Sequence, residues 1–315
     1  MDLTPETTSY FKSICEREII FVRKELLHLP QDQWTDVPVY KQYRFCNVHR
    51  CYDKTYKLMA KLSTLLRADT YGDLHPGLRA VLRRYASNSM VQWLIDNLIY
   101  HTPICNFIYS ANCGHPEELF AAMLDAYHNG TVELMTGSFV VRRSGRDYEE
   151  MLAYYKAGSD FYALLQDNKI TTSRDAVAYF KTHAPLCADF TAYCIVSDWL
   201  YLAPQKFIDR YTWTAYGPGA YNGINLIVPT TKKTYLAHLR DLHTLWQFYG
   251  EEMVHYIANA VNLNPITLDE LCTNNGYLPI SQLLTAPLML DVEHWLCEYA
   301  KYVRGWSRKK YRRTK

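Results

Sequence analysis

The sequence of 315 residues lacks any apolar run of the roughly 20 residues that a membrane-spanning helix needs. It also lacks a secretory signal pattern, and its nine cysteines follow no regular spacing. We therefore expect reduced thiols in a soluble protein of the cytoplasm that does not bind membranes. Cys105, Cys113 and His115 would supply part of a metal site, but no second Cys or His pair has ligand spacing, so no metal site is predicted.

The motifs of several common enzyme classes are missing as well. There is no P-loop of the form G-x-x-x-x-G-K-[ST], no dinucleotide-binding G-x-G-x-x-G after a strand, no H-E-x-x-H and no G-x-S-x-G. The zinc-deaminase signature is also absent. An enzyme with this sequence would work without the common nucleotide cofactors.

Charge of one sign is not in excess, since the formal net charge is only +2. The distribution is less even, because residues 304–315 (RGWSRKKYRRTK) contain many Lys and Arg and no acidic residue. Such a tail attracts phosphates through counterion release, although a solvated chain end has the same composition. The basic residues that we expect to bind DNA are Arg304, Arg308, Lys309 and Lys310.

Hydrophobic periodicity predicts a mainly α-helical protein with one short β-hairpin near residues 131–143. We expect a single helical domain over residues 1–303, or two intertwined lobes, followed by the basic tail 304–315. Helical patterns occur near residues 9–29, 44–66, 77–85, 89–99, 116–128, 148–165, 174–182, 187–202, 231–263, 267–272 and 292–303.

A glycine motif stands between the helical patterns of the C-terminal half. Gly217-Pro218-Gly219 is followed by Gly223 at the start of an apolar run, as in helix-hairpin-helix DNA-binding proteins. Glycines open backbone conformations closed to other residues, so amides at a helix N-terminus could converge on a DNA phosphate. An ordinary tight turn between helices is the alternative.

The segment Tyr43–Lys54 (YRFCNVHRCYDK) carries the first group of candidate site residues. On a helix, Asn47, Arg50 and Lys54 would share one face, with Asp53 next to Arg50. A guanidinium beside an amide and a lysine suits phosphate or carboxylate binding. A surface ion pair between Arg50 and Asp53 is the alternative.

Two further candidates for acid–base chemistry lie on C-terminal helices. His294, Glu298 and Lys301 follow at steps of four and three, and a His–carboxylate pair on one face is the simplest general base. Glu293 could reach the edge of the same pocket, whereas the alternative is a solvent-facing helix with ordinary ion pairs. Asp198, in an otherwise apolar helix, is either a base or a structural hydrogen-bond acceptor.

Read in order, several segments resemble the helical family of phage alpha-glutamyl/putrescinyl thymine pyrophosphorylases, or amino acid:DNA transferases. That family is related to the helical domain of 5-hydroxymethyluracil DNA kinases. Departures from its pattern are Cys46, His49 and Lys54. The matching pieces are Arg17-Glu18, Trp34-Thr35-Asp36, Arg44–Arg50 with Asp53, Thr136–Phe139, Asp189–Asp198, Gly217–Gly223, and Glu293–Glu298 with Lys301.

The resemblance implies a fold like that of helix-hairpin-helix DNA glycosylases, and two substrates. These are double-stranded DNA with a pyrophosphorylated 5-hydroxymethyluracil, and an amino acid or polyamine whose amine displaces pyrophosphate. A kinase would carry a P-loop, so the transferase step fits better. A glycosylase and a non-catalytic DNA-binding module are the rival interpretations. In a phage the protein would act in the host cytoplasm.

In the transferase hypothesis each candidate has a role. Arg44, Arg50 and Lys54 would neutralise the pyrophosphate, with Asn47, Glu293 and Lys301 beside it, and a Mg²⁺ ion is left open. Either His294 with Glu298, or Asp198, would deprotonate the amine. Asp53 is also predicted to be a catalytic residue.

Overall fold

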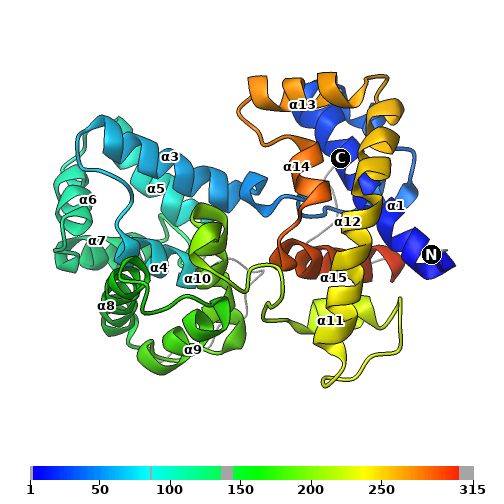
Figure 1. Cartoon of the computed structure of the whole chain (residues 1–315). Helices are drawn as coiled ribbons and strands as arrows, with labels where there is room; N and C mark the ends of the chain where they lie inside the picture. Colours follow the sequence, from blue (N-terminus) through cyan, green and yellow to red (C-terminus); the bar gives the residue numbers. More distant parts are fainter. Residues whose placement is uncertain (1–2, 86, 136–144, 305–315) are drawn as a thin grey trace. The chain divides into compact units, whose positions relative to one another are not determined.

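The computed structural model describes residues 3–85, 87–135 and 145–304, and within these residues every regular element is helical (Figure 1). The prediction of a mainly α-helical protein is therefore confirmed. Residues 131–135 form bends, and the remainder of the expected β-hairpin, 136–144, lies outside the described residues.

The chain divides into two compact units. Unit 1 combines residues 1–50 with 211–315, and unit 2 consists of residues 51–210. Unit 1 is thus built from two segments that are far apart in the sequence.

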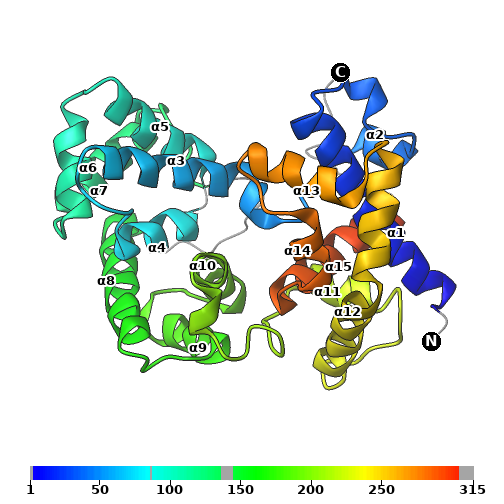
Figure 2. The ribbon, with the colours of Figure 1, turned by 45° about the horizontal axis from the view of Figure 1, so that its top comes forward.

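Unit 1 is organised around aromatic residues of its two long C-terminal helices. Trp246 and Trp295 pack edge to face with ring centroids 4.8 Å apart, and Phe11 stacks on Trp246 at 4.2 Å. Figure 2 shows the helices in a second view. They are α1 (Pro5–Phe21), α2 (Pro38–Gln42), α11 (Pro218–Ile224), α12 (Tyr235–Ala260), α13 (Pro265–Asn274), α14 (Ile280–Thr285) and α15 (Met289–Val303).

Unit 2 is organised around α4, in which residues 77–85 are all buried. Gly77 of α4 and Gly158 of α8 let these two helices approach closely, because a Cβ atom on either would overlap the other helix. The helices are α3 (Lys54–Ala68), α4 (Pro76–Tyr85), α5 (Asn88–Ile99), α6 (Ile104–Asn112), α7 (Glu117–His128), α8 (Asp147–Gln166), α9 (Ser173–His183) and α10 (Asp189–Leu202).

The expected helix over residues 44–66 is wrong in its first part, because α3 begins only at Lys54. Residues 44–49 are irregular, and distant groups take up their backbone hydrogen bonds. The guanidinium of Arg17 donates to the carbonyls of Cys46 and Asn47, and the indole of Trp295 donates to the carbonyl of Val48 at 2.9 Å. Tertiary partners replace the hydrogen bonds of a helix here.

Candidate functional site

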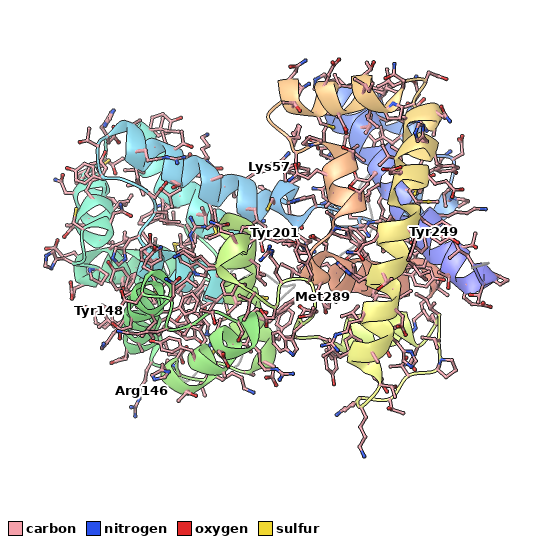
Figure 3. All side chains as sticks on the ribbon, in the orientation of Figure 1. Lys57, Arg146, Tyr148, Tyr201, Tyr249 and Met289 are labelled. Atoms are coloured by element: carbon pink, nitrogen blue, oxygen red, sulfur yellow. The ribbon has the colours of Figure 1, made fainter. Side chains whose placement is uncertain are left out.

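Unit 2 contains a cavity of about 670 Å³ lined by residues of α3, α4, α8 and α10. Its wall includes the aromatic side chains of Tyr56, Tyr162, Trp199 and Tyr201. Tyr201 lies on α10 in Figure 3. A space of this size, lined by aromatic rings and a few polar groups, is typical of small-molecule sites. We call it the unit-2 cavity.

Asp198 of α10, predicted as a candidate from its apolar surroundings, lines this cavity with a side chain that is only 1% exposed. Its Oδ1 lies 2.9 Å from Nε of Arg83, and its Oδ2 lies 3.8 Å from Nη1 of Arg79. Burial raises the pKa of Asp198, and the two guanidinium groups oppose that rise. Asp198 thus forms an ion pair with Arg83, and the choice between a base and a structural hydrogen-bond acceptor stays a prediction.

Arg83 is held firmly beside Asp198. It donates from Nε to the carbonyl of Cys194 at 3.3 Å and from Nη2 to the hydroxyl of Tyr56 at 3.3 Å. The guanidinium also lies over the Tyr56 ring, 4.6 Å from its centroid. These contacts hold Arg83 against Asp198 and Tyr56, which line the cavity, whereas Arg83 itself does not line it.

Arg79 lines the same cavity but is held more loosely. Its distance of 3.8 Å to Asp198 exceeds a hydrogen bond, and no described residue accepts a hydrogen bond from its side chain. The guanidinium lies 5.9 Å from the centroid of the Trp199 ring. With Arg83 already balancing Asp198, the charge of Arg79 is available to an anionic ligand.

His75 adds an oriented hydrogen-bond donor to the cavity wall. Its Nδ1 accepts a hydrogen bond from the backbone N–H of Gly77 at 3.1 Å, and its ring stacks on Tyr155. Burial lowers the pKa of His75, which favours the neutral imidazole. Because Nδ1 is an acceptor, the proton of the neutral ring is on Nε2.

Sequence reasoning did not select Arg79, Arg83 or His75. The sequence did contain a sign of this site, because Arg79 and Arg83 stand at i and i+4 in the short helix PGLRAVLRRY. Every face of that helix is buried. Buried arginines need partners, so this helix and the isolated Asp198 could have been matched.

In unit 1, Glu298 of α15 is buried and holds the irregular segment 44–49. Its Oε1 lies 2.5 Å from Nζ of Lys301, and its Oε2 accepts the backbone N–H of Cys46 at 3.2 Å. Burial raises the pKa of Glu298, but Lys301, Arg17 and Arg50 outweigh it and lower the pKa to about 2. The carboxylate is therefore ionised and fully engaged in the fold.

The other members of the α15 group have neighbours of their own. Nε2 of His294 lies 3.7 Å from Oε2 of Glu293, and Oε1 of Glu293 accepts the backbone N–H of Gly217 at 3.2 Å. Glu298 is thus paired with Lys301 and with the backbone N–H of Cys46. The role of His294 with Glu298 as a general base stays a prediction.

The glycine motif is not a hairpin between two helices, because residues 213–217 before α11 are irregular. Gly217 has φ −101°, and neither Gly219 nor Gly223 has a positive φ. The expectation that these glycines adopt a backbone conformation closed to other residues is therefore wrong. Gly219 and Gly223 instead let α11 pack on α15, since added Cβ atoms would overlap Cys297 and the Leu296 carbonyl. Contact of Gly217, Pro218, Gly219 and Gly223 with DNA stays a prediction.

The remaining predicted residues are distributed over both units. Arg44 and Asn47 line a second cavity, in unit 1, whereas Arg50 begins a short 3₁₀ turn that ends at Tyr52. In unit 2, Asp53 precedes α3 and Lys54 begins it, and neither lines the unit-2 cavity.

The basic tail is described only at its start. Arg304 follows α15 and is exposed, while Arg308, Lys309 and Lys310 lie outside the described residues. No helix in the described part of the chain is long and apolar enough to cross a membrane.

Comparison with known proteins gives one match. The family described as "5-hmdU DNA kinase, helical domain" matches residues 4–311, nearly the whole chain. The match is therefore to the family related to the pyrophosphorylases and transferases, and not to the pyrophosphorylase or transferase family that the motifs resemble. No curated protein matches, and no solved structure matches.

Proposed function

Because the chain belongs to the family of 5-hmdU DNA kinase helical domains, we propose that its unit-2 cavity binds a 5-hydroxymethyluracil nucleotide of DNA whose 5-substituent carries phosphate. Membership connects the chain with the modification of 5-hydroxymethyluracil in phage DNA. The nucleotide would leave the base stack to enter the cavity, as in other enzymes that act on bases.

The observation that carries the proposal is Arg79, a buried guanidinium on an aromatic cavity wall whose nearest carboxylate is already balanced by Arg83. An anionic substituent would replace that missing partner, with Nε2 of His75 as a second donor. The ring of Trp199 offers a face for the base, and such stacking contributes roughly 1–3 kcal/mol per base. The volume of about 670 Å³ is sufficient for one nucleotide.

The chemistry that we propose is replacement of pyrophosphate by an amine. The lone pair of the amine nitrogen forms a bond to the 5-methylene carbon while the carbon–oxygen bond breaks, and pyrophosphate leaves with that electron pair. The substituted ammonium that results then gives a proton to water. Arg79 would stabilise the charge on the departing oxygens, where electrostatic stabilisation counts most, and Asp198 would keep Arg83 and the cavity wall in place.

The description of the family supports a second candidate, in which the chain is the part of a DNA kinase that holds the substrate. These 315 residues contain no P-loop, so in this candidate they would hold the DNA substrate, and a P-loop outside them would bind ATP. In that case the cavity would bind unphosphorylated 5-hydroxymethyluracil at least as well as its phosphorylated form.

Nucleoside mass spectrometry tests the reaction. DNA carrying pyrophosphorylated 5-hydroxymethyluracil is incubated with the protein and with individual amino acids or putrescine, then digested. The transferase hypothesis predicts an aminated thymidine derivative and free pyrophosphate in equal amounts. Abasic sites would indicate a glycosylase, and unchanged nucleosides with every amine would contradict catalysis by this chain.

The matched variants are Arg79→Met and Lys61→Met. Arg79→Met keeps the side-chain volume and leaves Asp198 paired with Arg83, so product formation should fall at least about 100-fold through loss of a charged contact. Lys61 is an exposed cation of α3 that does not line the cavity, and its replacement should change little.

A further inference from the structure

Unit 1 contains a second cavity, of about 470 Å³, between α1 and the segment that follows α2. Three of its lining residues are cationic, namely Arg17, Lys24 and Arg44, and none of the described residues that line it is Asp or Glu. Trp34 and Tyr40 supply aromatic surface to the same wall. We call it the unit-1 cavity.

Arg17 gives this cavity a donor without an acceptor. Its side chain is only 6% exposed. Nε and Nη2 donate to the carbonyls of Cys46 and Asn47, at 2.8 to 3.2 Å, but Nη1 is buried and has no hydrogen-bond partner within the described residues. A buried charged donor left unpaired is costly, and a ligand oxygen would remove that cost.

The other two cations differ in how far they are neutralised. Nζ of Lys24 lies 2.5 Å from Glu25, and it also lies over the Trp34 ring at 5.6 Å. Arg44 is exposed, and no ion pair or hydrogen bond of its side chain is recorded among the described residues. Arg44 therefore contributes most of the unneutralised charge, whereas Arg17, whose charge also interacts with Glu298, contributes the unpaired donor Nη1.

We propose that the unit-1 cavity binds a phosphate group carried by a nucleotide. Two guanidinium groups with no lining carboxylate match a doubly charged phosphate better than a single carboxylate. The ring of Trp34 offers a face to the attached base. The phosphate belongs either to a free nucleotide or to a phosphorylated end of DNA.

Titration calorimetry with the full chain tests this proposal. The probes are inorganic pyrophosphate, thymidine 5′-monophosphate, and an oligothymidylate with or without a 5′-phosphate. The variants are Arg44→Ala, which removes an exposed group, and Arg17→Lys, which keeps the charge but loses Nη1. Lys12→Ala is the control, because Lys12 is exposed on α1 and does not line the cavity.

We expect Arg44→Ala and Arg17→Lys each to weaken phosphate binding by at least about tenfold, with Lys12→Ala unchanged. Stronger binding of the monophosphate indicates a free nucleotide, and stronger binding of the 5′-phosphorylated oligonucleotide indicates a DNA end. Thermal unfolding of each variant shows whether the fold is intact. If Arg17→Lys is unfolded, Arg44→Ala alone decides.

The proposal is independent of the unit-2 cavity, and the two can fail separately. If Arg79→Met abolishes all phosphate binding while Arg44→Ala changes none of it, the unit-1 cavity binds no phosphate and the proposal is wrong. If Arg44→Ala removes phosphate binding that Arg79→Met leaves intact, the unit-1 cavity binds phosphate, even if the proposed reaction at the unit-2 cavity is wrong. Absence of binding by every probe also overturns it.

Discussion

Glu298 in unit 1 and Asp198 in unit 2 are both buried against cations, and the two carboxylates are used differently. Glu298 in unit 1 accepts from Lys301 and from the backbone N–H of Cys46, and its pKa falls to about 2. Asp198 in unit 2 pairs closely with Arg83 and only distantly with Arg79, and burial raises its pKa. Asp198 lines the unit-2 cavity, whereas Glu298 lines neither that cavity nor the unit-1 cavity.

The difference separates a carboxylate that stabilises the fold from one that, in the proposed function, leaves a cation available to a ligand. Glu298 is satisfied by groups of its own unit, and those bonds hold segment 44–49 against α15. Asp198 fixes Arg83 and leaves Arg79 with spare charge beside the cavity. A buried carboxylate with two cations is thus informative about function, because one positive charge remains that the carboxylate does not neutralise.

The largest effect should come from Asp198→Ala. It leaves Arg79 and Arg83 buried without a counter-ion, so the free energy of unfolding should fall by about 3–5 kcal/mol. Urea unfolding measures it. Asp189→Ala on the same helix, which removes an exposed pair with Lys181, should cost less than about 1 kcal/mol. An equal loss of unfolding free energy in both variants would show that the buried ion pair stabilises the protein no more than the exposed one.

Glu298→Gln should remove a pH-dependent part of the stability. The folded pKa of about 2 lies below the ordinary 4.5, so ionised Glu298 stabilises the protein above pH 4.5, and this contribution is lost as the pH falls toward 2. The shift corresponds to about 3 kcal/mol. Urea unfolding at several pH values should show the difference between wild type and variant shrinking below pH 4.5.

His49, whose pKa burial lowers to about 4, titrates in the same range in both proteins and cancels in that difference. A difference that stays constant between pH 7 and pH 3 would contradict the structural role of Glu298.

A smaller loss of stability is expected from alanine substitutions of Gly219 and Gly223, the two glycines through which α11 packs on α15. A Cβ at Gly223 meets the backbone carbonyl of Leu296, whereas one at Gly219 meets the side chain of Cys297, which can rotate. Gly223→Ala should therefore cost about 1–3 kcal/mol, and Gly219→Ala less. Thermal unfolding compares them, and the reverse order would mean that α11 does not pack on α15 in this way.

The smallest effect on stability should be that of Arg79→Met. Asp198 keeps its close partner Arg83, so no carboxylate is left unpaired and the loss should stay below about 1 kcal/mol. Urea unfolding beside Asp198→Ala checks this. A loss of unfolding free energy as large as that of Asp198→Ala would show that Arg79 stabilises the fold and that its charge is not available to a ligand.

Local sequence patterns predicted the helices well but missed what depends on distant partners. The long pattern over 231–263 became α12, because its apolar spacing is sufficient to predict it. Segment 44–49 has helical spacing too, yet its carbonyls bind Arg17 and Trp295, and no local pattern reveals such partners.

The site was predicted in part for the same reason. Asp198 stood out because a carboxylate in an apolar helix needs a counter-charge. Arg79 and Arg83 did not, since arginines at i and i+4 are common on exposed helices. The spacing of Gly217, Gly219 and Gly223 is compatible with a phosphate-binding hairpin and with close helix packing, and only the position of α15 distinguishes them.

The most direct test compares the affinity for DNA containing one phosphorylated 5-hydroxymethyluracil with that for the same DNA containing thymine, by fluorescence anisotropy at fixed salt. We predict that wild type and Lys61→Met prefer the phosphorylated DNA by at least about tenfold, and that Arg79→Met loses this preference while still binding both DNAs. Equal affinity of the wild type for both DNAs, or a preference that survives in Arg79→Met, would contradict the assignment of the unit-2 cavity.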